Sequence, residues 1–243
     1  TKAISSLVLV SSLSLLGACS KDAKPSADLN GGTLFILSSA DKITHLDPQR
    51  NYSFEDQAFA SGYLNRTLTQ YTLSPDPKEA SVLVPDLATD TGTATNHSKT
   101  WEFTLRDGVK WEDGKPVTCA DIAYGISRTF ATEVITDGYT RATIMLDIPK
   151  SYGTSVYPGP YSATPKQQAL FDKAVVCYGN KITFHLAQPV TDFNYALTLS
   201  AFAPVRKDAD KREKYDDHIL SSGPYKILSY KPKSKLILVR NPR

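Results

Sequence analysis

Cys19 has the most specific chemical setting of any residue near the start of the chain. It follows Leu16-Gly17-Ala18, and the four residues together resemble the bacterial lipobox, in which the thiol receives a diacylglyceryl group and cleavage leaves the cysteine as the new N-terminus. Residues 3–18 form an uncharged apolar run, shorter than the roughly 20 residues that span a bilayer. We therefore expect a lipoprotein signal peptide over residues 1–18. The alternative is a plain secretory signal with a chance cysteine.

Lipid attachment would also place the folded part of the protein. Two acyl chains give stable anchoring, so the mature protein is expected on the extracytoplasmic face of the cell membrane. Residues 19–30 are small and polar and include a proline, which is typical of a flexible tether. The folded part is then expected over residues 31–243.

Export changes how the other two cysteines are interpreted. Cys119 and Cys177 form an even pair, and neither lies in a C-x-x-C motif or a cluster with histidine that could hold zinc. An oxidising compartment favours a disulfide between them, and the alternative is two buried free thiols.

Motifs of catalysis and metal binding are missing from the sequence. There is no G-x-S-x-G, no P-loop and no G-x-G-x-x-G, so the sequence offers no candidate catalytic residues. The histidines show no H-E-x-x-H motif, no i, i+4 pairing and no nearby cysteine: His45, His97, His185 and His218. The sequence predicts a protein without enzyme activity, metal or cofactor.

Composition and charge agree with a soluble domain that does not bind nucleic acid. Hydrophobic residues make up 41% and charged residues 22%, which provides enough apolar material for a core. The net charge of +3 arises from 28 basic and 25 acidic residues spread along the chain, without a long basic run that could follow a phosphate backbone.

The periodicity predicts a mixture of helices and strands. Alternating apolar residues predict strands over 101–106 and 182–186, and strands are also expected over 33–37, 225–230 and 236–240. Helices are expected over 54–71, after Thr118 with its capping-box partner Asp121, after Thr164-Pro165, and over 193–199. Without a regular βαβ order, the fold class is mixed α/β (α+β).

Three segments in order resemble family 5 of the bacterial solute-binding proteins, the large peptide and nickel class that serves ABC importers. They are residues 33–48, which end in Leu46-Asp47-Pro48; the hallmark W-E-F-T-L-R-D-G-V-K-W-E-D-G-K-P-V-T-C-A-D-I-A-Y-G-I-S-R, residues 101–128; and S-S-G-P-Y-K-I, residues 221–227. Cys119 replaces a small residue common at that point of the hallmark.

The resemblance implies a fold of two lobes that close over a ligand held between them. It implies that this chain is the first lobe, truncated before the second, and that ligand contacts come from Lys42, Ile43, Thr44 and Tyr139. The hallmark itself is expected to be scaffold. A chain with one lobe should expose half of its site and bind ligand weakly.

The cargo is left open by the sequence. A peptide is the first expectation, and the alternatives are a nickel chelate, haem, an oligosaccharide, or a surface lipoprotein without transport function. The expected partners are the ABC importer permease subunits and the membrane, with a monomer as the state of the complete protein.

Overall fold

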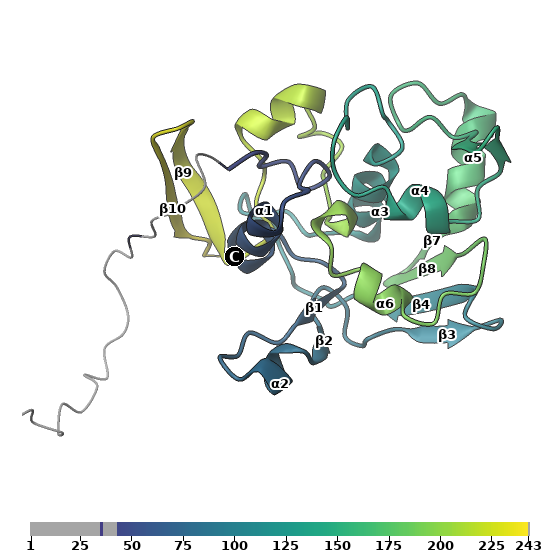
Figure 1. Cartoon of the computed structure of the whole chain (residues 1–243), viewed down its shortest axis with the longest axis horizontal. Coiled ribbons are helices and arrows are strands. Elements are labelled where there is room, and N and C mark those ends of the chain that lie inside the picture. Colours follow the sequence, from purple (N-terminus) through teal and green to yellow (C-terminus); the bar gives the residue numbers. More distant parts are fainter. Residues whose placement is uncertain (1–34, 36–42, 243) are drawn as a thin grey trace, which may run out of the picture. The chain divides into compact units, whose positions relative to one another are not determined.

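The computed structural model describes Phe35 and residues 43–242, and the chain divides into two units, residues 1–39 and 40–243. All helices and strands of the described residues lie in the second unit (Figure 1). The predicted signal peptide, the tether and Cys19 lie outside the described residues. Within the described part, every helix is too short or too polar to cross a membrane.

The second unit is built around a four-stranded antiparallel sheet in the order β3-β4-β8-β7 (Figure 1). The predicted strand 101–106 is confirmed as β4, in which Trp101 and Phe103 are buried and their neighbours are half-buried. Trp101 lies opposite Phe184 and Phe103 opposite Ile182, so the inward residues of β4 and β8 pack together. The bounds are β3 Thr93–Thr95, β4 Thr100–Thr104, β7 Val175–Tyr178 and β8 Lys181–His185.

Helices α3, Cys119–Arg128, and α5, Pro165–Ala174, pack against this sheet and begin where the sequence predicts. Thr118 and Asp121 form a complete capping box at α3, and the side chain of Asp121 accepts the Thr118 N–H at 2.9 Å. Ile122 and Ile126 are buried against the sheet. The same reciprocal hydrogen bonds satisfy the first turn of α5, which Thr164 caps.

A disulfide joins Cys119, the first residue of α3, to Cys177 in β7, with their Cα atoms 5.8 Å apart. The predicted pairing is therefore confirmed. It links the hallmark segment to the far edge of the sheet.

The predicted helix 54–71 is wrong in its second half. Helix α1, Phe54–Phe59, continues as a π-helical turn, η1, Ala60–Leu64, and Asn65 is already extended. The amides of Asp86 and Ala88 donate to the Leu68 carbonyl and Leu87 donates to Thr67, so pairing with a distant segment overrides the local helical pattern. Residues 69–71 instead form strand β1, Thr69–Tyr71, which pairs with β2, Leu83–Pro85, across α2, Pro77–Ala80.

Other short elements complete the unit. The predicted strands 225–230 and 236–240 are confirmed as a hairpin, whereas the helix expected over 193–199 is only one turn long. The bounds are α4 Arg141–Met145, β5 Lys150–Ser151, β6 Thr154–Ser155, α6 Phe193–Ala196, the 3₁₀ turns η2 Ser200–Phe202 and η3 Arg212–Asp217, β9 Tyr225–Lys231 and β10 Lys235–Arg240. All strand pairs described are antiparallel, which agrees with the predicted mixed α+β class.

Two clusters of buried apolar side chains stabilise the unit. The larger fills the space between the four-stranded sheet, α3 and α5. The smaller contains Leu46, Leu64, Tyr215 and Ile227, and it supports the segment that leads into α1. Phe35, the only described residue of the predicted strand 33–37, lies outside any strand and is 85% exposed, so the predicted strand is wrong for this residue.

Candidate functional site

A hollow of about 430 Å³ lies where the segment before α1 meets the loop before α4. We call it the Asp56 hollow. Its lining residues come from these two segments and from α1, which contributes Asp56: Thr44, His45, Arg50, Tyr52, Ser53, Asp56, Asp137 and Gly138. A second hollow of about 260 Å³ shares Thr44 with it and is otherwise lined by Ile43, Leu46, η3 and the β9–β10 hairpin.

Of the described members of the predicted contact set, Ile43 and Thr44 line these hollows, whereas Tyr139 lines neither and contacts the lining residue Tyr52. Thr44 lines both, and Ile43 lines the second. Tyr139 follows Gly138, and its ring stacks on Tyr52 with centroids 5.2 Å apart. Lys42 lies outside the described residues. Whether these residues contact a ligand stays a prediction.

Gly138 explains how the loop that carries Tyr139 lies so close to the segment before α1. Its φ of +117° belongs to the region that favours glycine, and a Cβ at this position would overlap the carbonyl oxygen of Gln49. Glycine is therefore the residue that lets the two lining segments touch.

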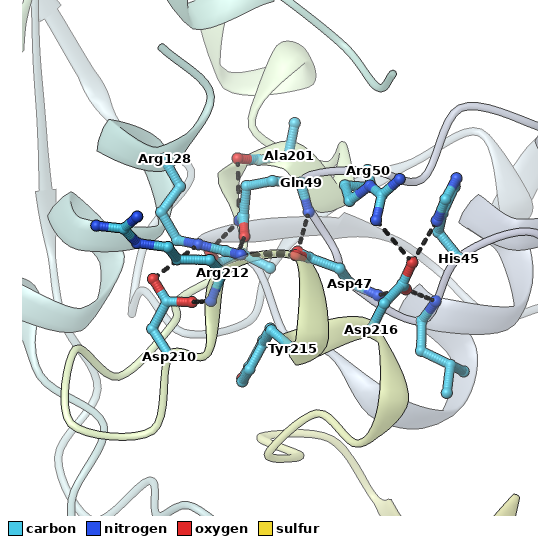
Figure 2. Close-up of polar contacts among 12 residues, drawn as sticks. His45, Asp47, Gln49, Arg50, Arg128, Ala201, Asp210, Arg212, Tyr215 and Asp216 are labelled. Carbon is cyan, nitrogen blue, oxygen red and sulfur yellow. Dashed lines mark hydrogen bonds and ion pairs between the residues drawn. The ribbon is translucent and has the colours of Figure 1, made fainter. Parts of the chain in front are cut away.

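An ion network joins three distant parts of the chain beside the Asp56 hollow, and Figure 2 shows its members His45, Arg50 and Asp216. His45 lies between two carboxylates: Nδ1 contacts Asp216 Oδ2, and Nε2 lies 2.7 Å from Asp137 Oδ2. Arg50 contacts the same two residues, at 3.2 Å from Asp137 and 3.1 Å from Asp216. Partial burial raises the pKa of Asp137, but hydrogen bonds from His45 and Arg50 outweigh it, and the net pKa is lowered.

Asp216 also holds the backbone of the lining segment. Its Oδ1 accepts the amides of Leu46 at 2.6 Å and Asp47 at 2.8 Å. One carboxylate from η3 thus fixes both the His45 ring and the peptide units that follow it.

A second, fully buried pair lies behind this network and is formed by Arg128 and Asp47 (Figure 2). Arg128 Nη1 and Nη2 donate to the two Asp47 oxygens at 2.9 and 2.6 Å, and Nη1 also donates to Gln49 Oε1 at 2.5 Å. Its Nε lies 3.3 Å from Asp210 Oδ2. Burial lowers the pKa of Arg128, but the charge and hydrogen bonds of Asp47 outweigh it, so the net pKa is raised.

Sequence reasoning missed Tyr52, Asp56, Asp137 and Asp216. Asp56 follows Ser53 by three residues, and Ser53 Oγ accepts the Asp56 amide at 3.0 Å, so the sequence alone indicates an ordinary helix start. Asp56 is 3% exposed, and its Oδ1 accepts the Thr44 amide at 3.2 Å. Its Oδ2 is buried without a hydrogen-bond partner among the described residues.

The site offers hydrogen bonds, charge and aromatic surface. Among the described residues, no three His, Cys, Asp or Glu side chains are grouped so as to hold a metal ion. A positioned backbone segment, the exposed Tyr52 stacked on the partly buried Tyr139, and paired charges form an arrangement that is suited to holding a ligand.

Residues 82–243 match the family model of the bacterial extracellular solute-binding proteins, family 5, in its middle region, and the chain belongs to this family. The sequence resemblance to family 5 is thereby confirmed.

The chain is also similar to individual peptide-binding proteins. The chain is 24% identical to the oligopeptide-binding protein OppA of Bacillus subtilis over 96% of its own length and 40% of that protein. It is 29% identical to the periplasmic murein peptide-binding protein MppA of Escherichia coli over 67% of its length and 29% of that protein. Among solved structures, the clavulanic acid biosynthesis oligopeptide-binding protein 2 aligns with a TM-score of 0.77 and 34% identity, over 87% of this chain and 36% of that one. The chain thus spans well under half the length of these relatives.

Proposed function

We propose that this chain belongs to the extracytoplasmic substrate-binding component of an ABC importer and that it captures peptides. The observation that carries the proposal is the match to the oligopeptide-binding protein 2 structure, at 34% identity over 87% of the chain. OppA of Bacillus subtilis and MppA of Escherichia coli are named for peptide ligands as well.

The geometry supports a ligand with both polar and apolar groups. Tyr52 is 63% exposed, and its stack on Tyr139 offers an aromatic surface beside the hollow that Thr44 lines. We infer that Lys42, Ile43, Thr44 and Tyr139 contact the peptide, and that closure of a facing surface buries it.

The proposal includes the setting of the protein. Lipid attachment at Cys19 would hold it on the outer face of the membrane, where a permease of the importer receives the cargo. The protein would act there as a monomer.

A thermal-shift panel tests the proposed cargo. Short peptides at millimolar concentration should raise the melting temperature, because a ligand of the native state stabilises it by mass action, whereas oligosaccharides and chelated nickel should not. We expect binding by this chain to be weaker than micromolar by calorimetric titration, because the facing surface that would bury the peptide is not among the described residues. A rise with chelated nickel and none with peptides would contradict the cargo.

Tyr139→Ala should reduce the shift that peptides cause, because it removes half of the aromatic surface. Tyr178→Ala is the matched control, since Tyr178 is 84% exposed on β7 and, unlike Tyr139, does not stack on the lining residue Tyr52. Equal responses of the two variants would exclude Tyr139 from the contact set.

A further inference from the structure

Asp56 carries a carboxylate oxygen that the described part of the chain leaves unpartnered. The side chain is 3% exposed and lines the Asp56 hollow. Oδ1 accepts the Thr44 amide at 3.2 Å, and Oδ2 is buried without a hydrogen-bond partner among the described residues. Because an unpaired buried carboxylate is costly, such an atom indicates a place for a donor that arrives from outside.

The other charged groups of the hollow are already matched to one another. Asp137 contacts His45 through Oδ2 and Arg50 through Oδ1, and Asp216 contacts both cations as well. The basic side chains that line the hollow are His45 and Arg50, and both are held by Asp137 and by Asp216, so neither pairs with Asp56. An incoming donor should be a cation.

The aromatic wall favours the same chemistry. Tyr52 lines the hollow and stacks on Tyr139. An alkylammonium or guanidinium group beside a tyrosine face gains cation–π attraction, and its methylene stem packs on the ring. The volume of about 430 Å³ leaves room for one long side chain.

We propose that the Asp56 hollow is a subsite for a basic side chain of the bound peptide, with Asp56 Oδ2 as the acceptor of its ammonium or guanidinium group. This rests on the proposed function, because it names the kind of peptide that the site prefers. Asp56 is then a residue that determines specificity.

A pair of blocked amino acids tests the subsite apart from peptide capture. Nα-acetyl-lysine N-methylamide and Nα-acetyl-norleucine N-methylamide differ by the ammonium group, and amide NMR of the protein reports which residues each one touches. The lysine probe should shift the amides of Thr44 and Gly138, and the norleucine probe should bind roughly tenfold or more weakly, since a desolvated charge pair is worth at least that ratio. Equal responses to both probes would overturn the subsite, as expected if only water pairs with Asp56.

Asp56→Asn keeps the shape of the side chain and an acceptor for the Thr44 amide, but it removes the charge. It should abolish the preference for lysine over norleucine. Asp107→Asn, in an exposed turn, changes the net charge equally and should leave the preference intact. A preference that survives in Asp56→Asn would contradict the assignment.

Peptides separate this inference from the proposed function. If Ala-Lys-Ala binds more tightly than trialanine and Asp56→Asn removes the difference, the subsite stands. If both peptides bind equally in the unchanged protein, the subsite is wrong while peptide capture survives. If the lysine probe shifts Thr44 but neither peptide binds, Asp56 accepts a cationic group, but peptide capture fails and with it the assignment of the hollow to a side chain of a bound peptide.

Discussion

At the scale of single residues, one buried ion pair connects two of the sequence motifs. Asp47 belongs to Leu46-Asp47-Pro48, and Arg128 ends the hallmark segment; both side chains are fully buried and meet through two hydrogen bonds. Asp47 also lies three residues after Thr44, which begins the segment before α1 that lines the Asp56 hollow. The pair therefore holds the segment that offers the proposed ligand contacts against α3.

Arg128→Met should lower the free energy of unfolding by about 3–5 kcal/mol, because it leaves Asp47 buried without its partner. Urea denaturation followed by circular dichroism measures the loss. Lys181→Met is the control: Lys181 pairs with Glu102 at 2.6 Å, but both are nearly half exposed, and such surface pairs contribute about 1 kcal/mol or less. Similar losses in the two variants would show that the Arg128 pair does not stabilise the fold more than a surface pair.

At the scale of elements, the hallmark forms scaffold, as expected. Trp101 is 4% exposed and Trp111 is fully buried, so neither side chain faces a hollow. Trp111 Nε1 lies 3.3 Å from Asp121 Oδ2, the oxygen that also closes the capping box of α3. The strand, the turns and the helix start of the hallmark thus stabilise one another, and the disulfide at Cys119 fixes the helix start to β7.

Loss of the disulfide should destabilise the protein without moving the site. In the chain-entropy model, a loop of 58 residues corresponds to roughly 4 kcal/mol, so Cys119→Ala with Cys177→Ala should lower the free energy of unfolding by up to that amount. Cys19→Ala leaves the disulfide intact and should not change the free energy of unfolding. Mass spectrometry without reductant should find the crosslinked Cys119 and Cys177 peptides, and quantitative alkylation of both thiols would contradict the bond in the exported protein.

At the scale of the whole molecule, residues 43–48 of the first motif meet the second and third motifs in one folded unit. Asp47 and Arg128 join the first to the second, and Glu112 joins the second to the third, because its Oε2 accepts the Ser221 amide at 2.9 Å and its own amide donates to the Ser221 carbonyl at 3.0 Å. The motifs that resemble family 5 thus contact one another directly, and these contacts hold the lining segments in place.

The proposed membrane anchor can be tested in cells. Cys19→Ala should release the protein from the membrane fraction into the medium, because the acyl chains have no other attachment point in the lipobox. Ser20→Ala alters the neighbouring residue and should leave the protein bound to the membrane. Membrane retention of Cys19→Ala would count against lipid attachment.

Signals carried by contiguous residues could be predicted from the sequence. The alternation of Trp101 and Phe103, the capping boxes at Thr118 and Thr164, and the hairpin of β9 and β10 depend on spacings of two to four residues or on one turn. The hallmark, read in the same way, identified the family. The pairing of Cys119 with Cys177 followed because only two cysteines remained after Cys19.

Only the tertiary structure decided how the site is assembled. His45 meets Asp137 and Asp216 across 92 and 171 residues, and no local spacing encodes such pairs. The helix was expected to reach residue 71 but ends at Leu64. The carbonyls of Thr67 and Leu68 instead accept hydrogen bonds from the distant amides of residues 86–88. Asp56 resembled an ordinary residue of a helix start, and its unpartnered oxygen became visible only once folding had buried it. Local chemistry determined the elements, whereas burial and long-range charge pairing determined which of their side chains form the site.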